Sequence, residues 1–171
     1  GTEEGNCPRA TRRLGCPWRP IRWKRKRQDR LQQLPQPAWL PPGAHDAKIN
    51  VDGGLSKIGD KGASAVVCRD KRGNYLGASA IIFEGRLDPA ILEAQACSEA
   101  LALATDLHIQ SVCVASDCLE VVTRIADDSS CKFYPILQDI KHQRKDFSDV
   151  KFIHENRRHN GEAHALAKAA A

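Results

Sequence analysis

The sequence predicts one α/β domain built on a mixed sheet. Three short apolar segments, separated by Gly- and Asn-containing turns, come first, and after them apolar segments alternate with stretches of helical periodicity. The chain has 171 residues, which is enough for one hydrophobic core. Segments joined by tight turns predict an antiparallel meander, whereas strands separated by helices require parallel pairing through right-handed crossovers. The predicted order is βββαβααβα, with five strands.

The three strands of the meander are expected at residues 48–52, 62–69 and 75–83. Gly53 and Gly54 follow the first strand and are expected to end it. The segment 70–74 places Gly and Asn where a turn between the second and third strands needs them.

The second half of the domain alternates helices and strands. Asp88 can cap a helix over residues 89–107, with Pro89 in its first turn. Its apolar residues follow helical spacing, and they are Leu92, Ala96, Ala100, Leu103 and Leu107. The remaining elements are a strand at 111–116, a helix from 119 to about 128, a helix through 136–147, a strand at 150–154 and a helix at 161–171.

Residues 1–46 differ from the rest in composition. They hold seven of the nine prolines and carry a net charge of +6, whereas residues 47–171 carry −1. Without sustained periodicity, this segment is expected to be a disordered basic leader before a domain at 47–171. The basic run at 22–27 could be a nuclear-import signal or an electrostatic anchor on nucleic acid, and the alternative is a solvated tail.

Cysteine usage and hydropathy indicate the compartment of the protein and argue against a disulfide-rich or membrane-spanning protein. Seven scattered Cys without a C-x-x-C pair indicate a reducing, intracellular compartment rather than a disulfide framework or structural zinc. Cys97 and Cys113 fall in apolar patterns and are expected to be buried. No apolar run is long enough for a membrane span. The chain begins at Gly1 and contains no Met, so we expect a processed, tagged or partial chain.

Three acids stand in apolar surroundings and suggest a shared cation site. Asp52 and Asp117 each follow a predicted strand, and Glu93 lies early in a predicted helix. A desolvated carboxylate needs a hydrogen bond, a cation or a metal, and a hard divalent ion suits carboxylate ligands. Each acid also has a simpler explanation: Asp52 could cap a turn, Glu93 could be an exposed residue in the first turn of its helix, and Asp117 could cap the next helix.

Five motifs follow one another along residues 39–170. They are INVDGG with the upstream WLPPG, the hairpin GASAVVCRDKRGN, Glu93 in its helix, VCVASDC, and HENRRHN leading into ALAK. In this order they resemble the type 1 ribonuclease H family, most closely the domains associated with plant retroelement reverse transcriptases. The resemblance implies an RNase H-like five-stranded mixed sheet, flanked by helices, in which the first and fourth strands lie side by side.

The resemblance also implies the chemistry. Family members hold two Mg²⁺ ions (or Mn²⁺) and hydrolyse the RNA strand of an RNA–DNA hybrid. Asp52 would bridge the ions, and Glu93 and Asp117 would each complete one ion's shell. His154 matches a loop histidine that assists proton transfer or product release, and a strand-end hydrogen bond is its alternative role. The nucleic-acid contacts expected from these motifs are Gly53, Gly54, Arg157, Arg158 and Asn160.

The last helix departs from the family pattern. His164 stands where the fourth aspartate is expected, and Glu162 should project from another side of the helix. A neutral imidazole binds Mn²⁺ better than Mg²⁺, so we expect reduced or Mn²⁺-favoured activity. The leading hypothesis is a monomeric hybrid ribonuclease. The alternatives are a catalytically impaired nucleic-acid-binding module of retroelement origin and a protein-interaction domain.

Overall fold

The computed structural model describes residues 19–20, 39–57, 60–85, 88–127 and 129–171. The strands are β1 (Arg19–Pro20), β2 (Ala47–Leu55), β3 (Lys61–Asp70), β4 (Tyr75–Glu84), β5 (Ser111–Ser116) and β6 (Asp149–His154). The helices are α2 (Pro89–Asp106), α3 (Leu119–Asp127), α4 (Tyr134–Gln143) and α5 (Gly161–Ala170), with 3-10 turns η2 (Arg144–Asp146) and η3 (Arg157–His159).

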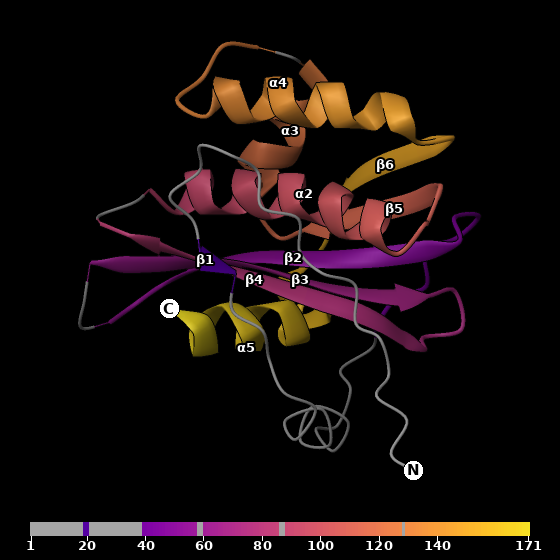
Figure 1. Ribbon diagram of the computed structural model, residues 1–171, viewed down its shortest axis with the longest axis horizontal. Helices are drawn as coiled ribbons and strands as arrows, with labels where there is room; N and C mark the ends of the chain where they lie inside the picture. The colour runs from indigo at the N-terminus through magenta and orange to yellow at the C-terminus, as the bar shows by residue number, and fades with distance from the viewer. Residues whose placement is uncertain (1–18, 21–38, 58–59, 86–87, 128) are drawn as a thin grey trace.

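These strands form one mixed sheet in the order β1-β4-β3-β2-β5-β6. β2, β3 and β4 pair antiparallel, and β5 and β6 add in parallel beyond β2. Helix α2, with α4 beyond it, covers one face of the sheet, and α5 lies on the other face (Figure 1). The predicted fold class and its five strands are therefore confirmed. β1, which pairs with β4 at the sheet edge, was not predicted.

The core forms mainly between the sheet and α2. Ile49 and Val51 on β2 are buried together with Ala94 and Cys97 of α2, in a cluster that extends to α4. Since side chains alternate along a strand, Lys48 and Asn50 fall on the opposite face of β2. Cys113 is also buried, as the sequence predicted for it and for Cys97.

β2 is longer than the sequence predicts, because Gly53 and Gly54 continue the strand instead of ending it. They pair with Ser64 and Ala63 of β3. A Cβ on Gly53 would lie 2.8 Å from the Leu92 Cβ, and one on Gly54 would lie 3.0 Å from the Ala167 carbonyl carbon. The two glycines therefore let α2 and α5 approach opposite sides of the same strand.

The helix boundaries agree closely with the sequence. The Ala90 N–H donates to Asp88 Oδ1 at 2.9 Å, which confirms Asp88 as the cap of α2. The helix predicted through residues 136–147 is shorter: α4 ends at Gln143, η2 follows, and Phe147 is extended.

The leader is only partly described. Residues 1–18 and 21–38, including the basic run at 22–27, lie outside the described residues. Residues 39–46 precede β2, and Trp39 lies beside Lys48, whose ammonium is 5.7 Å from the ring centroid. Among the described residues, no helix is both long and apolar enough to cross a membrane.

Candidate metal and active site

The fold brings the three predicted acids together. Asp52 lies on β2, and Asp117 directly follows β5, its parallel neighbour, in which Ser116 pairs with Val51. Glu93 reaches the same place from α2. One carboxylate oxygen from each residue lies within 4.8 Å of the others. The predicted adjacency of Asp52 and Asp117 is therefore present in the structure.

Glu93 is fixed by two hydrogen bonds. The Gly53 N–H donates to Oε1 at 2.9 Å, and the Ser116 hydroxyl donates to Oε2 at 3.0 Å. The residue is 6% exposed, so it is not a solvated helix residue. Ser116 was missed by the sequence analysis, although a hydroxyl at the last position of a buried strand could have indicated it. Each Glu93 oxygen retains a lone pair for a further ligand.

Burial changes the acidity of two of the acids. It raises the pKa of Asp52 to about 7, and the negative charge of Asp117 adds to this rise while Arg157 opposes it. Burial likewise raises the pKa of Glu93 to about 8, opposed by the Gly53 N–H and aided by Asp52 and Asp117. Crowded, desolvated carboxylates favour protons or cations as partners, and a divalent ion satisfies several at once.

Two nitrogen-bearing side chains border the acids. His164 Nδ1 lies 3.1 Å from Asp52 Oδ2, which places the residue at the site, as predicted from its position in the last helix. Burial and the charge of Arg157 lower the pKa of His164, which favours the neutral imidazole in this contact. The Arg157 guanidinium lies 3.0 Å from His164 Nε2, and its Nε is 3.9 Å from Asp117 Oδ2.

Glu162 points away from the site. Its carboxylate accepts two hydrogen bonds from the Arg69 guanidinium, at 2.6 and 2.9 Å, and so ties α5 to β3. This matches the rotation expected from helical geometry, since two residues correspond to about 200°. Glu162 therefore does not replace the missing aspartate.

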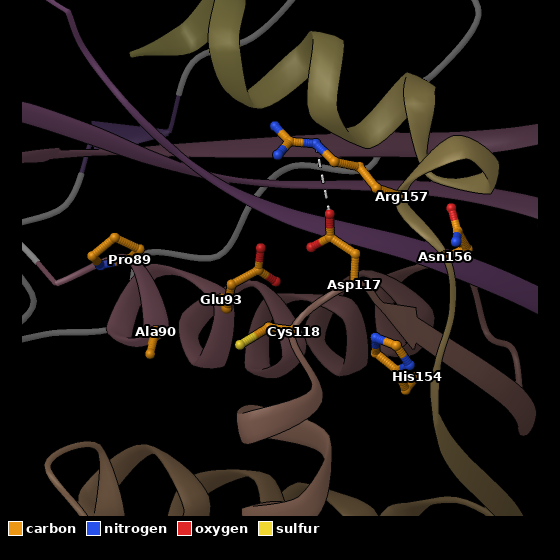
Figure 2. A pocket seen from close by; sticks show the side chains of 8 residues that line it. All are labelled: Pro89, Ala90, Glu93, Asp117, Cys118, His154, Asn156 and Arg157. Atoms are coloured by element: carbon orange, nitrogen blue, oxygen red, sulfur yellow. Dashed lines mark ion pairs between the residues drawn. The ribbon is translucent and has the colours of Figure 1, made fainter.

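A cavity of about 470 Å³ opens beside the acids. Glu93, Asp117, His154, Asn156 and Arg157 are among the residues that line it, and Figure 2 shows the ion pair between two of them, Arg157 and Asp117. His154 ends β6 opposite Ser116 and is exposed. The histidine that the sequence singled out thus borders the same cavity as the acids.

The residues expected to contact nucleic acid fall into two groups. Arg157 and Arg158 are exposed on η3. The other three are engaged within the fold: Gly53 and Gly54 are half-buried, the Gly53 N–H donates to Glu93, and Gly54 lies against α5. Asn160 is 1% exposed, and its amide donates to the Val51 carbonyl at 2.7 Å, so it fastens the start of α5 to β2.

The donor set fits a hard divalent cation. Three carboxylates from different elements converge, two of them buried. Oxygen ligands of this kind suit Mg²⁺ and Mn²⁺, and the imidazole of His164 at the edge of the cluster favours Mn²⁺. The guanidinium of Arg157 and the imidazole of His164 border this cluster at Asp117 and Asp52.

Most of the described domain matches a known protein family. A family described as "Reverse transcriptase-like" matches residues 50–170, which include all three acids and His164. The chain belongs to this family. No curated protein sequence matches it.

Several solved structures share the fold of this family member. RNase H1 from Halobacterium salinarum aligns with a TM-score of 0.65 at 19% identity, covering 71% of this chain and 93% of that protein. The N-terminal RNase H domain of a Mycobacterium tuberculosis protein aligns with a TM-score of 0.66 at 19% identity, covering 74% of this chain and 94% of that one. LC11-RNase H1 was isolated from compost and solved with an RNA/DNA hybrid. It aligns with a TM-score of 0.60 at 21% identity, covering 72% of this chain and 95% of that one.

Proposed function

We propose that this protein is a divalent-metal-dependent endonuclease that hydrolyses the RNA strand of RNA–DNA hybrids. The observation that carries the proposal is the convergence of Asp52, Glu93 and Asp117 within 4.8 Å of one another, beside an open cavity. Related folds support the substrate class, since LC11-RNase H1 was solved with an RNA/DNA hybrid. The retroelement origin suggested by the motifs remains part of this proposal.

The carboxylates of Asp52, Glu93 and Asp117 would hold two divalent ions. When bound, paired divalent ions stabilise the attacking and leaving oxygens of a phosphodiester displacement. The Gly53 N–H and the Ser116 hydroxyl orient the Glu93 carboxylate, so that it needs no reorganisation to bind. His164 would bind the ion nearer to it more weakly than an aspartate, and Mn²⁺ would be preferred there.

The cavity residues would handle the substrate. Arg157 can donate two hydrogen bonds to a phosphate, which positions the strand without reading its sequence. His154 is exposed and lines the same cavity, where an imidazole can act as a general acid or base. Selection for RNA would rest on contacts to the 2′-hydroxyl.

A second candidate function is a nucleic-acid-binding module with impaired chemistry. The contacts of His164 with Asp52 and of Arg157 with Asp117 favour it, because both place nitrogen donors on acids that the ions need. This module would bind hybrids and not cleave them.

Cleavage of an end-labelled RNA–DNA hybrid with Mg²⁺ or Mn²⁺ separates these candidates. We expect cleavage by the wild type, faster with Mn²⁺, and a loss of at least about 100-fold in Asp52→Asn, which keeps the shape but removes the charge. Equal cleavage by both proteins would reject the nuclease proposal. Hybrid binding without cleavage under either metal would favour the second candidate.

A further inference from the structure

A buried ion pair lies near the acids but is not part of their cluster. Lys48 of β2 is 1% exposed and Glu155, the residue after β6, is 6% exposed. Lys48 Nζ donates to Glu155 Oε1 at 2.5 Å, and Asn50 Nδ2 donates to Oε2 at 3.1 Å. Both oxygens of Glu155 are therefore held by the strand that carries Asp52.

The pair also binds the segment that precedes the sheet. Lys48 Nζ donates to the Leu40 carbonyl at 2.8 Å and faces the Trp39 ring. The segment 39–40, β2 and the residue after β6 thus meet at one ammonium group.

Glu155 sits among residues that border the cavity. His154 precedes it, and Asn156 and Arg157 follow it; all three line the cavity and are exposed. The Glu155 N–H donates to the Ser116 carbonyl at 2.9 Å, beside the hydroxyl that binds Glu93. The one buried residue of this exposed segment is therefore fastened at its backbone to β5 and at its side chain to β2.

A gain in stability does not by itself explain this buried ion pair, because apolar residues of similar volume often stabilise a buried site equally well. We propose that Lys48, Asn50 and Glu155 form a positioning cluster that holds residues 154–157 over the acids, so that Arg157 meets the substrate phosphate. The inference rests on the proposed function, since it gives these residues a role in placing a hybrid at the site. None of the three belongs to the acid cluster or lines the cavity.

The test replaces the cluster with apolar residues in the full chain, as Lys48→Met/Asn50→Leu/Glu155→Leu. The measured quantities are the affinity for an RNA–DNA hybrid without divalent ions and its dependence on salt. We expect affinity to fall about threefold to tenfold, and the slope of log affinity against log salt to shrink by roughly 0.7–0.9, the value of one lost phosphate contact. Ser98→Ala is the matched control, since it breaks a hydrogen bond to Asp139 between α2 and α4.

The decisive arm repeats the replacement in an Arg157→Ala background. A cluster that acts through Arg157 should have little further effect there, because coupled residues are not additive. Unchanged affinity and slope in the triple variant, or full additivity with Arg157→Ala, would overturn the proposal. If the triple variant fails to fold, Glu155→Gln is measured in the wild-type and in the Arg157→Ala background. We expect a smaller loss of hybrid affinity in the wild-type background and no further loss in Arg157→Ala.

Amide hydrogen exchange decides the inference even if the wild type does not bind hybrids, a result that would itself count against the proposed function. The amides of Arg158, His159 and Asn160 are held by hydrogen bonds within residues 156–160. Faster exchange of these amides in the triple variant, but not in Ser98→Ala, supports positioning. Equal exchange in all three proteins overturns it.

Discussion

At the scale of single residues, the burial of Asp52 and Glu93 has a measurable cost. Their pKa values in the folded protein are about 7 and 8, whereas the ordinary values are 3.8 and 4.5. Between about pH 4 and pH 8 the folded chain therefore binds more protons than the unfolded chain. These two groups must lower the free energy of unfolding as pH rises through that window.

We expect the metal-free protein to lose up to about 6 kcal/mol of stability from these two groups between pH 5 and pH 8. Urea denaturation with a chelator present measures this, and added Mn²⁺ should restore the loss. Asp52→Asn should be more stable than the wild type at pH 8 and show a flatter pH dependence. Identical pH profiles for the two proteins would contradict the assignment of the rise to Asp52.

His164 provides the second test at this scale. His164→Asp adds a fourth carboxylate beside Asp52, and we expect it to tighten Mg²⁺ binding by about tenfold or more, because affinity for hard cations follows the number of charged ligands. Calorimetric titration measures the change. His164→Asn is the matched control, with nearly the same shape and no charge. Equal Mg²⁺ affinity in both variants would show that the aspartate is not what the site lacks.

The acids could be identified from the sequence because each interrupts an apolar pattern and matches a family motif. The groups that orient them could not. In the sequence, Ser116 is indistinguishable from any residue that ends a strand. Its hydrogen bond to Glu93 depends on how α2 crosses the sheet. The burial of Lys48 and Asn50 was missed for the same reason: their partner Glu155 is more than 100 positions away in sequence.

At the scale of secondary-structure elements, two glycines set how closely the helices approach β2. We expect Gly53→Ala to destabilise the protein by about 1 to 3 kcal/mol, because its Cβ would meet Leu92 and the Glu93 backbone at 2.8–2.9 Å. The shift of α2 should also weaken Mn²⁺ binding through Glu93.

Gly161→Ala is the control for Gly53→Ala. Gly161 begins α5, and a Cβ there has no heavy atom within 4 Å. Its thermal denaturation midpoint should equal or slightly exceed that of the wild type. A Gly53→Ala protein as stable as Gly161→Ala would contradict the close packing of α2 on β2.

Elements were predicted well where local signals agree. Asp88 and Pro89 locate the start of α2, and hydrophobic spacing gives its length. The length of β2 was wrong because glycine usually ends a strand, whereas here Gly53 and Gly54 are kept in it by pairing with β3 and packing of two helices. β1 was missed because its two residues carry no periodic pattern.

At the scale of the whole molecule, the domain boundary can be placed by truncation. The sequence puts it at residue 46, but Trp39 and Leu40 contact Lys48, so a chain that starts at residue 39 should be more stable than one that starts at residue 47, by about 1 to 3 kcal/mol. Chemical denaturation measures the difference. Equal stability of the two truncated chains would return the boundary to residue 46.

The central claim is that Asp52, Glu93 and Asp117 form one divalent-cation site, and Mn²⁺ titration tests it most directly. Electron paramagnetic resonance counts free Mn²⁺ as protein is added, and it needs no substrate. The account predicts saturable binding by the wild type, its loss in Asp52→Asn, and at least about tenfold weaker binding in Glu93→Gln. Equal Mn²⁺ binding by all three proteins would contradict it.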